Sequence, residues 1–83
     1  MAETLIGKVN HWFGKIGVAG VELTDKLAVG DHIHILGHTT DFDQTVTSMQ
    51  MMHQDVAEAG AGDDVGIKVR FRARTGDRVY KVT

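Results

Sequence analysis

The stretch AGAGDDVGIKV, from Ala59 to Val69, combines a turn signal with a strand signal. Glycine can adopt the positive φ that a sharp corner needs, and aspartate accepts hydrogen bonds from nearby backbone N–H groups, so Gly62 and Asp63 predict a turn. Apolar residues then occupy every second position, as they do in a strand with one buried face. We therefore expect a tight corner that leads into a strand over Val65–Arg72.

The Gly-Asp pair of that corner recurs in a chain that has 10 glycines and no proline. Its turns must therefore be formed by flexible residues at positive φ. We expect each aspartate to accept hydrogen bonds from N–H groups one or two residues further on, and we interpret these residues as structural, with a catalytic role for the aspartates as the alternative. The expected turn residues are Gly30, Asp31, Gly62, Asp63, Gly66, Gly76 and Asp77.

Strand signals account for most of the remaining chain. The one helix candidate, Gln54–Ala59, is short and ends in glycine, so we expect a loop with at most one helical turn. Strands at about 10-residue spacing are typical of a small barrel or sandwich. The expected strands are Leu5–Phe13, Gly17–Leu23, His32–Leu36, Gln44–His53, Val65–Arg72 and Arg78–Val82.

A family resemblance distinguishes between these two architectures. The residues Ala61, Gly62, Asp63, Val65, Gly66 and Ile67 match the A-G-D-x-V-G-[I/L] turn and strand of the second domain of translation GTPases such as elongation factor Tu. Leu27–Ile35 (LAVGDHIHI) is similar to the family's V-G-D-x-[V/I] corner, Val46–Met52 (VTSMQMM) resembles its methionine-containing strand, and Ile6–Leu23 looks like its opening hairpin. The resemblance implies that residues 1–83 form a single all-β domain, a six-stranded closed barrel with Greek-key connections.

Several functions are disfavoured by what the sequence lacks. It has no G-x-x-x-x-G-K-[S/T] phosphate loop, and 83 residues cannot hold a GTPase domain beside the barrel, so we expect no nucleotide binding by that mechanism. It has no cysteine, and its single serine, Ser48, lies in no nucleophile motif. We expect a protein that is not an enzyme and has no cofactor, with metal-dependent hydrolysis as the minor alternative. No segment has the pattern of a signal peptide or the length of a membrane span, and the lack of cysteine suits a reducing compartment, so we expect a cytoplasmic protein. We also expect it to be a monomer.

The charge pattern suggests one surface for binding. The net charge of −2 argues against a general nucleic-acid binder, but Lys68, Arg70, Arg72 and Arg74 occupy alternate positions and would share one strand face over about 20 Å. Arginine binds phosphate oxygens bidentately, and in the resembled family the second domain contacts RNA, so the row is a candidate site for tRNA or ribosomal RNA. The alternative is a solvated face that aspartates on neighbouring strands neutralise.

Three further groups of side chains have a functional and a structural interpretation. Trp12 and Phe13 point to opposite faces, so one of them can reach the surface and stack on a base, or else close the mouth of the barrel. The methionines at positions 49, 51 and 52 are expected as core residues, with an adaptable partner surface as the alternative. His32 and His34 share a strand face, but a third ligand would have to come from His38, His53 or Asp31 through folding alone, so we expect no metal site.

Two functions from different classes remain. The first is a non-catalytic binding module that docks on RNA or a ribonucleoprotein, either tRNA or the ribosome, through the basic strand. The second is a protein-interaction or accessory barrel that acts with a separately encoded enzyme or GTPase.

Overall fold

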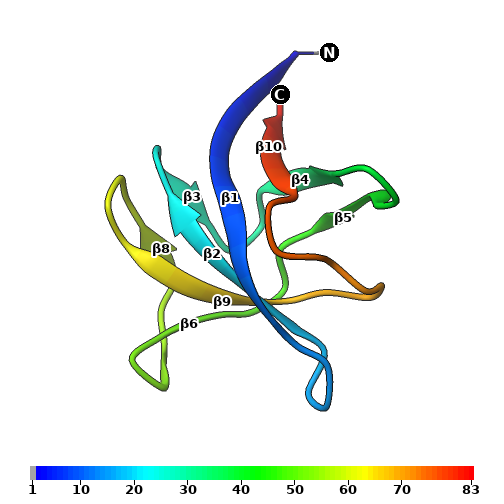
Figure 1. Ribbon diagram of the computed structural model, residues 1–83. Coiled ribbons are helices and arrows are strands. Elements are labelled where there is room, and N and C mark those ends of the chain that lie inside the picture. The colour runs from blue at the N-terminus through cyan, green and yellow to red at the C-terminus, as the bar shows by residue number, and fades with distance from the viewer. Residues whose placement is uncertain (1) are drawn as a thin grey trace.

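The computed structural model describes residues 2–83, which form ten strands and no helix (Figure 1). No helix long and apolar enough to cross a membrane occurs in that range. The main sheet has the antiparallel order β5-β4-β10-β1-β2-β9-β6-β7, and β3 pairs with β8. The strands are β1 (Glu3–Phe13), β2 (Val18–Leu23), β3 (Leu27–Ala28), β4 (His32–Leu36), β5 (Asp41–Thr45), β6 (Met49–Met51), β7 (Gln54–Asp55), β8 (Glu58–Ala59), β9 (Asp64–Lys68) and β10 (Arg78–Val82).

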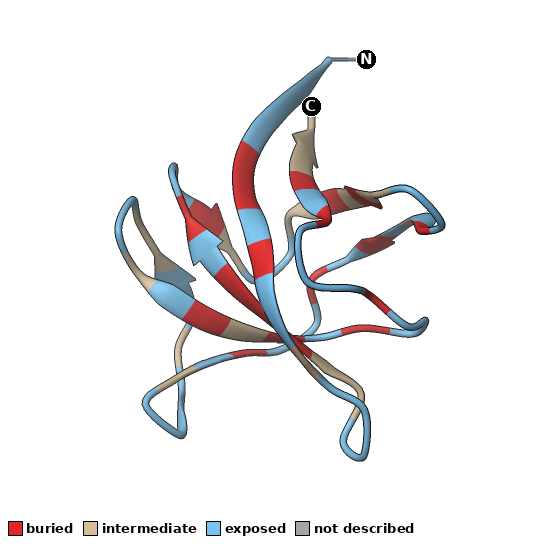
Figure 2. Cartoon of the chain, viewed as in Figure 1, coloured by how far each residue is buried: buried red, intermediate tan, exposed pale blue. Residues whose placement is uncertain are grey.

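The sheet curls around one apolar core. Along β2, Ala19, Val21 and Leu23 are buried, and Ile33 and Ile35 on β4 and Val79 on β10 are fully covered. Figure 2 shows buried and exposed stretches following one another along β1, and on β4 the buried Ile33 and Ile35 alternate with half-buried residues, which is the period of two expected for a strand with one face inward. Removal of these side chains from water is the main force that holds the strands together.

The all-β prediction is confirmed, and two of the expected strands, His32–Leu36 and Arg78–Val82, have the bounds found for β4 and β10. Other bounds were wrong. The strand expected over Gln44–His53 is divided into β5 and β6, because the N–H of Val46 turns to the carbonyl of Asp31. The expected loop at Gln54–Ala59 contains the two short strands β7 and β8.

The three Gly-Asp corners share one geometry. Gly30, Gly62 and Gly76 have φ of 101°, 89° and 97°, values that favour glycine. In each corner the N–H of the aspartate donates to the carbonyl three residues earlier, and the aspartate carboxylate accepts from the N–H of that same earlier residue at 2.7–2.9 Å. The expected position of the donors was therefore wrong, because they lie three residues before the aspartate and not one or two residues after it. The donors are Ala28, Gly60 and Arg74, and the acceptors are Asp31, Asp63 and Asp77.

Gly66 lies in the middle of β9 and not in a turn, which corrects its assignment as a turn residue. Its register partner on β2 is Gly20. A Cβ atom added at position 66 would lie 3.0 Å from Cγ1 of Val18, so the requirement for glycine here comes from close side-chain packing.

Gln44 bridges a gap in the sheet. Within residues 2–83 no strand ladder joins the β5 end of the main sheet to its β7 end, so the closed barrel stays a prediction. The side chain of Gln44 on β5 is buried; its Nε2 donates to the carbonyl of Lys68 and its Oε1 accepts from the N–H of Arg70, both at 2.9 Å. One side chain thus takes the place of a strand ladder between β5 and the end of β9.

A cluster of histidines and carboxylates lies on the outer face of β4 and β5. Both ring nitrogens of His34 contact carboxylates, Nδ1 to Glu3 at 2.7 Å and Nε2 to Asp41 at 2.6 Å. Ionised carboxylates only accept hydrogen bonds, so both contacts are hydrogen bonds when both ring nitrogens carry protons, and the pair of carboxylates favours the imidazolium form of His34. The hydrogen bond to Asp41, followed by the bond to Glu3, raises the pKa of His34 against the opposing effect of burial. The neighbouring bond from His32 lowers the pKa of Asp43.

We predict that the cluster makes stability fall as the pH rises. The ordinary pKa of histidine is 6.5, and that of His34 is raised in the folded state. Its stabilisation is therefore complete below about pH 6.5 and is lost as the pH rises through the raised value. Urea denaturation of H34Q should show a flatter pH dependence of the unfolding free energy above about pH 6 than the unsubstituted protein. The matched control is H38Q, since His38 is exposed. An unchanged slope in H34Q would contradict the assignment.

Candidate binding surfaces

The basic row is not a strand face. β9 ends at Lys68: the N–H of Val69 makes one more bond in the register of β2, to the carbonyl of Gly17, and the N–H of Arg70 donates to the side chain of Gln44 and not to a strand. We call residues Arg70–Arg74 the basic segment. Phe71, expected to face inward, is 59% exposed, which corrects the expected alternation. The exposed residues of the segment are Arg70, Phe71, Arg72 and Arg74, whereas Val69 before it and Ala73 within it are buried.

The basic segment carries uncompensated positive charge. The ion pairs found among residues 2–83 involve His32, His34 and Lys81, and none involves an arginine. No close ion pair joins these arginines to an aspartate in the described part of the chain. Phe71 packs edge-on against Phe42 with ring centroids 5.4 Å apart, so an aromatic ring lies exposed among the arginines. Lys68 is separate from them, since its Nζ donates to the carbonyl of Ile16 at 2.5 Å.

Trp12 and Phe13 occupy different environments. Trp12 is half-buried and packs against the core. Phe13 is 45% exposed and lies 4.3 Å from the ring of His11, measured between centroids. Phe13 lines a hollow to which no arginine contributes. The structure therefore does not bring the predicted aromatic contact and the basic segment into one site.

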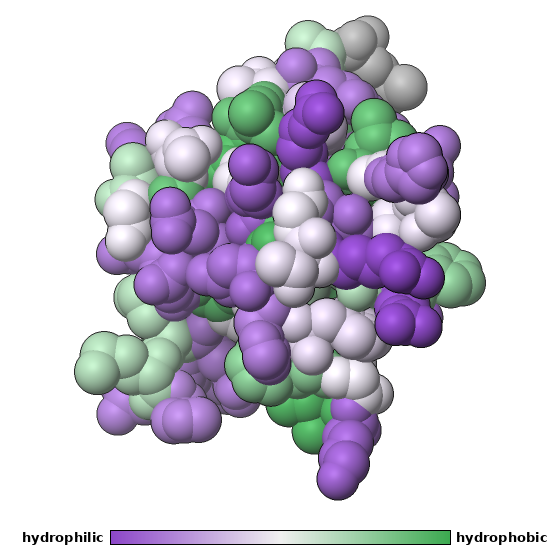
Figure 3. All heavy atoms as spheres, in the orientation of Figure 1, coloured by the Kyte–Doolittle hydropathy of each residue, from purple (hydrophilic) through white to green (hydrophobic). Residues whose placement is uncertain are grey.

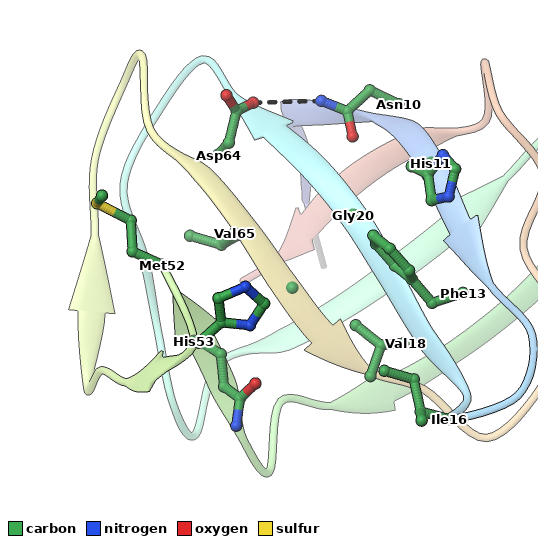
Figure 4. Close-up of a pocket in the computed structure, with 12 residues that line it drawn as sticks. Asn10, His11, Phe13, Ile16, Val18, Gly20, Met52, His53, Asp64 and Val65 are labelled. Atoms are coloured by element: carbon green, nitrogen blue, oxygen red, sulfur yellow. Dashed lines mark hydrogen bonds between the residues drawn. The ribbon is translucent and has the colours of Figure 1, made fainter.

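That hollow lies on the outer face of β1, β2, β9 and the β6–β7 hairpin, and it has a volume of about 280 Å³. We call it the glycine groove and define it by Phe13, Ile16, Gly20, Met52, Asp64 and Gly66. Figure 4 shows Phe13 and Ile16 on one side of the groove and Met52 and His53 on the other. Figure 3 shows that the face seen in Figure 1 is mostly hydrophilic, with one of its small apolar areas over the hairpin between β1 and β2.

Sequence reasoning missed the glycine groove. Gly20 and Gly66 each carry a signal for close backbone packing, but only the strand register places them opposite one another. Of the three methionines expected in the core, Met49 is buried and Met51 is half-buried, whereas Met52 is 89% exposed.

The histidine cluster does not form a metal centre as it stands. Among residues 2–83, no group of three or more His, Asp or Glu side chains has an arrangement that could hold a metal ion. Both nitrogens of His34 contact carboxylates, and Nε2 of His32 contacts Asp43 at 2.5 Å.

Two curated proteins are similar to this chain in sequence. An uncharacterized protease of Methanocaldococcus jannaschii is 45% identical over 76 residues, which are 90% of this chain and 19% of that protein. A collagenase of Porphyromonas gingivalis is 33% identical over 81 residues, which are 95% of this chain and 22% of that protein. The chain thus spans about a fifth of the length of these curated relatives.

A solved structure extends the comparison to three dimensions. The C-terminal domain of a Geobacillus thermoleovorans protein described as a U32 peptidase superposes with a TM-score of 0.89 at 18% identity, covering 96% of this chain and 93% of that domain. At this identity the likeness shows the fold. The model of the family "Elongation factor Tu domain 2" matches residues 26–80, and the chain therefore belongs to the elongation factor Tu domain 2 family.

Proposed function

We propose that this chain is a non-catalytic accessory domain that binds protein and acts beside the catalytic part of a U32-type peptidase. Two comparisons together support the proposal. The chain is 45% identical to a segment that makes up about one fifth of a protease, and it has the fold of a peptidase's C-terminal domain. The chain matches nearly all of that domain, whereas it matches only a small share of each full-length relative. The rest of each relative is long enough to hold separate catalytic machinery.

The chemistry of the chain agrees with a binding role. It has no cysteine, and His32 and His34 contact carboxylates without forming the nucleophile, base and orienting group of a catalytic triad. Function in such folds depends on surface sites and not on the fold itself. The finer architecture, a closed six-stranded barrel with Greek-key connections, belongs to the same proposal: Gln44 would complete the closure and hold the outer face rigid.

We predict that the chain can replace the matching segment of the Methanocaldococcus jannaschii relative. That protease, expressed without its matching segment, should bind this chain in analytical ultracentrifugation, because 45% identity preserves much of the contact surface. The relative's own segment, supplied separately, serves as the positive control. If that segment binds and this chain sediments alone, the proposal fails.

Docking on RNA is a second candidate function, favoured by one specific observation. Arg70, Arg72 and Arg74 are exposed, none forms an ion pair among residues 2–83, and the ring of Phe71 lies between them in the chain. Exposed arginines can contact phosphate oxygens, and an exposed ring can stack on a base. The ligands that this candidate implies are tRNA and ribosomal RNA.

We predict that a tRNA acceptor-stem minihelix, if this second function holds, binds the unsubstituted chain with an affinity that falls steeply as salt rises. The double variant R70E/R72E should lose this binding, because each change replaces a phosphate-binding cation by an anion. The matched control is K15E/K26E, which changes the net charge equally at two exposed lysines outside the basic segment. Fluorescence anisotropy measures both variants. Equal affinities would reject the RNA role of the basic segment.

A further inference from the structure

We propose that the glycine groove binds an aromatic or long aliphatic side chain of a protein partner that carries a lysine or arginine beside it. The inference rests on the proposed function, since it assumes that the partner is a protein. It adds the place of contact and the chemistry of the partner residue.

The floor of the groove is backbone. Gly20 on β2 and Gly66 on β9 are register partners, so two adjacent strands lack side chains at the same point of the outer face. A Cβ atom at Gly20 would lie 3.0 Å from Oδ1 of Asn10, and one at Gly66 would lie 3.0 Å from Cγ1 of Val18. The two glycines thus keep open a depression that any larger residue would begin to fill.

The walls of the groove are large apolar side chains that are exposed to solvent. Phe13, Ile16 and Met52 are 45%, 58% and 89% exposed, although each is a large apolar side chain. Met52 and His53 form the two-residue turn between β6 and β7, with φ of 52° and 64°. A two-residue hairpin turn of this kind needs positive φ at both positions, which histidine adopts more readily than most residues, so Met52 is the unusual residue of the turn. The turn holds an adaptable thioether at one edge of the hollow.

The size of the groove fits a side chain. Sites for cofactors and drug-sized ligands have volumes of about 300–1,000 Å³. The glycine groove, at about 280 Å³, lies just below that range. Its apolar walls suit an aromatic ring or a long aliphatic chain, which would cover the exposed surface of Phe13 and Met52.

The carboxylate of Asp64 favours a positively charged group on the partner. Asp64 is the carboxylate that lines the groove among residues 2–83, together with the rings of His11 and His53; no lysine or arginine lines it, although Nζ of Lys68 contacts the carbonyl of Ile16 beside it. Oδ1 of Asp64 accepts from Nδ2 of Asn10 at 3.2 Å, as Figure 4 shows, and Oδ2 has no hydrogen bond within the described residues. Glu22 is the register partner of Asp64 and adds negative charge, although Lys8 lies opposite Glu22 on β1. An anionic ligand would be repelled by Asp64, whereas the partner cation can contact the open oxygen.

Two small probes test the inference with the intact chain alone. Tryptophanamide is an aromatic cation, and N-acetyltryptophan is a matched aromatic anion. In ¹⁵N–¹H NMR titrations, tryptophanamide should shift the amides of Gly20, Gly66 and His53, and N-acetyltryptophan should bind more weakly. D64N should weaken tryptophanamide binding about threefold to fivefold, the expected size for a solvent-exposed ion pair. M52A should weaken the binding of both probes, because it removes a wall of the groove.

D25N is the matched control for D64N, since it removes the same charge from an exposed residue outside the groove. The inference is overturned if neither probe shifts the groove amides, if both probes bind equally, or if D25N acts like D64N. If the unsubstituted chain binds tryptophanamide but does not associate with the truncated protease, the proposed function is rejected instead. If the chain associates with that protease and neither D64N nor M52A weakens the association, the inference is rejected but the proposed function is not.

Discussion

The buried side chain of Gln44 is the interaction that ties the start of the basic segment to β5. It supplies a donor to the carbonyl of Lys68 and an acceptor to the N–H of Arg70 where no strand ladder is present in the described chain. Leaving the polar atoms of this buried side chain without partners would cost about 1–3 kcal/mol each. The N–H of Arg70 donates to Gln44 and not to a neighbouring strand, and the arginines of the basic segment, which follows β9, are exposed.

The same sheet separates two chemically different surfaces. The basic segment follows β9 and lies beside β5, where Phe71 contacts Phe42. The glycine groove lies on the outer face of β2 and β9, with an apolar interior and a carboxylate at Asp64. A domain with these two surfaces can contact a cationic apolar segment and an anionic partner at different places. This arrangement agrees with an accessory domain better than with a catalytic one.

The sequence was sufficient to predict what depends on local pattern. Alternation and the Gly-Asp corner placed β4 with the correct bounds, and the glycines of all three corners have the positive φ that a turn of this kind needs. The end of β9 could not be predicted, since the apolar alternation continues to Ala73 and the residue that captures the N–H of Arg70 lies 26 positions earlier. The glycine groove depends on the register of Gly20 with Gly66 and on a left-handed Met52, which residue preferences disfavour.

Amide hydrogen exchange at Arg70 tests the closure by Gln44 most directly. The account predicts that the Arg70 N–H is protected in the unsubstituted protein, whereas the N–H of Phe71, which has no hydrogen-bond partner among residues 2–83, exchanges quickly. In Q44A the protection of Arg70 should be lost while Ile67, paired with Ala19 in the β2–β9 ladder, keeps its own. An Arg70 amide that exchanges as fast as that of Phe71 in the unsubstituted protein would contradict the account.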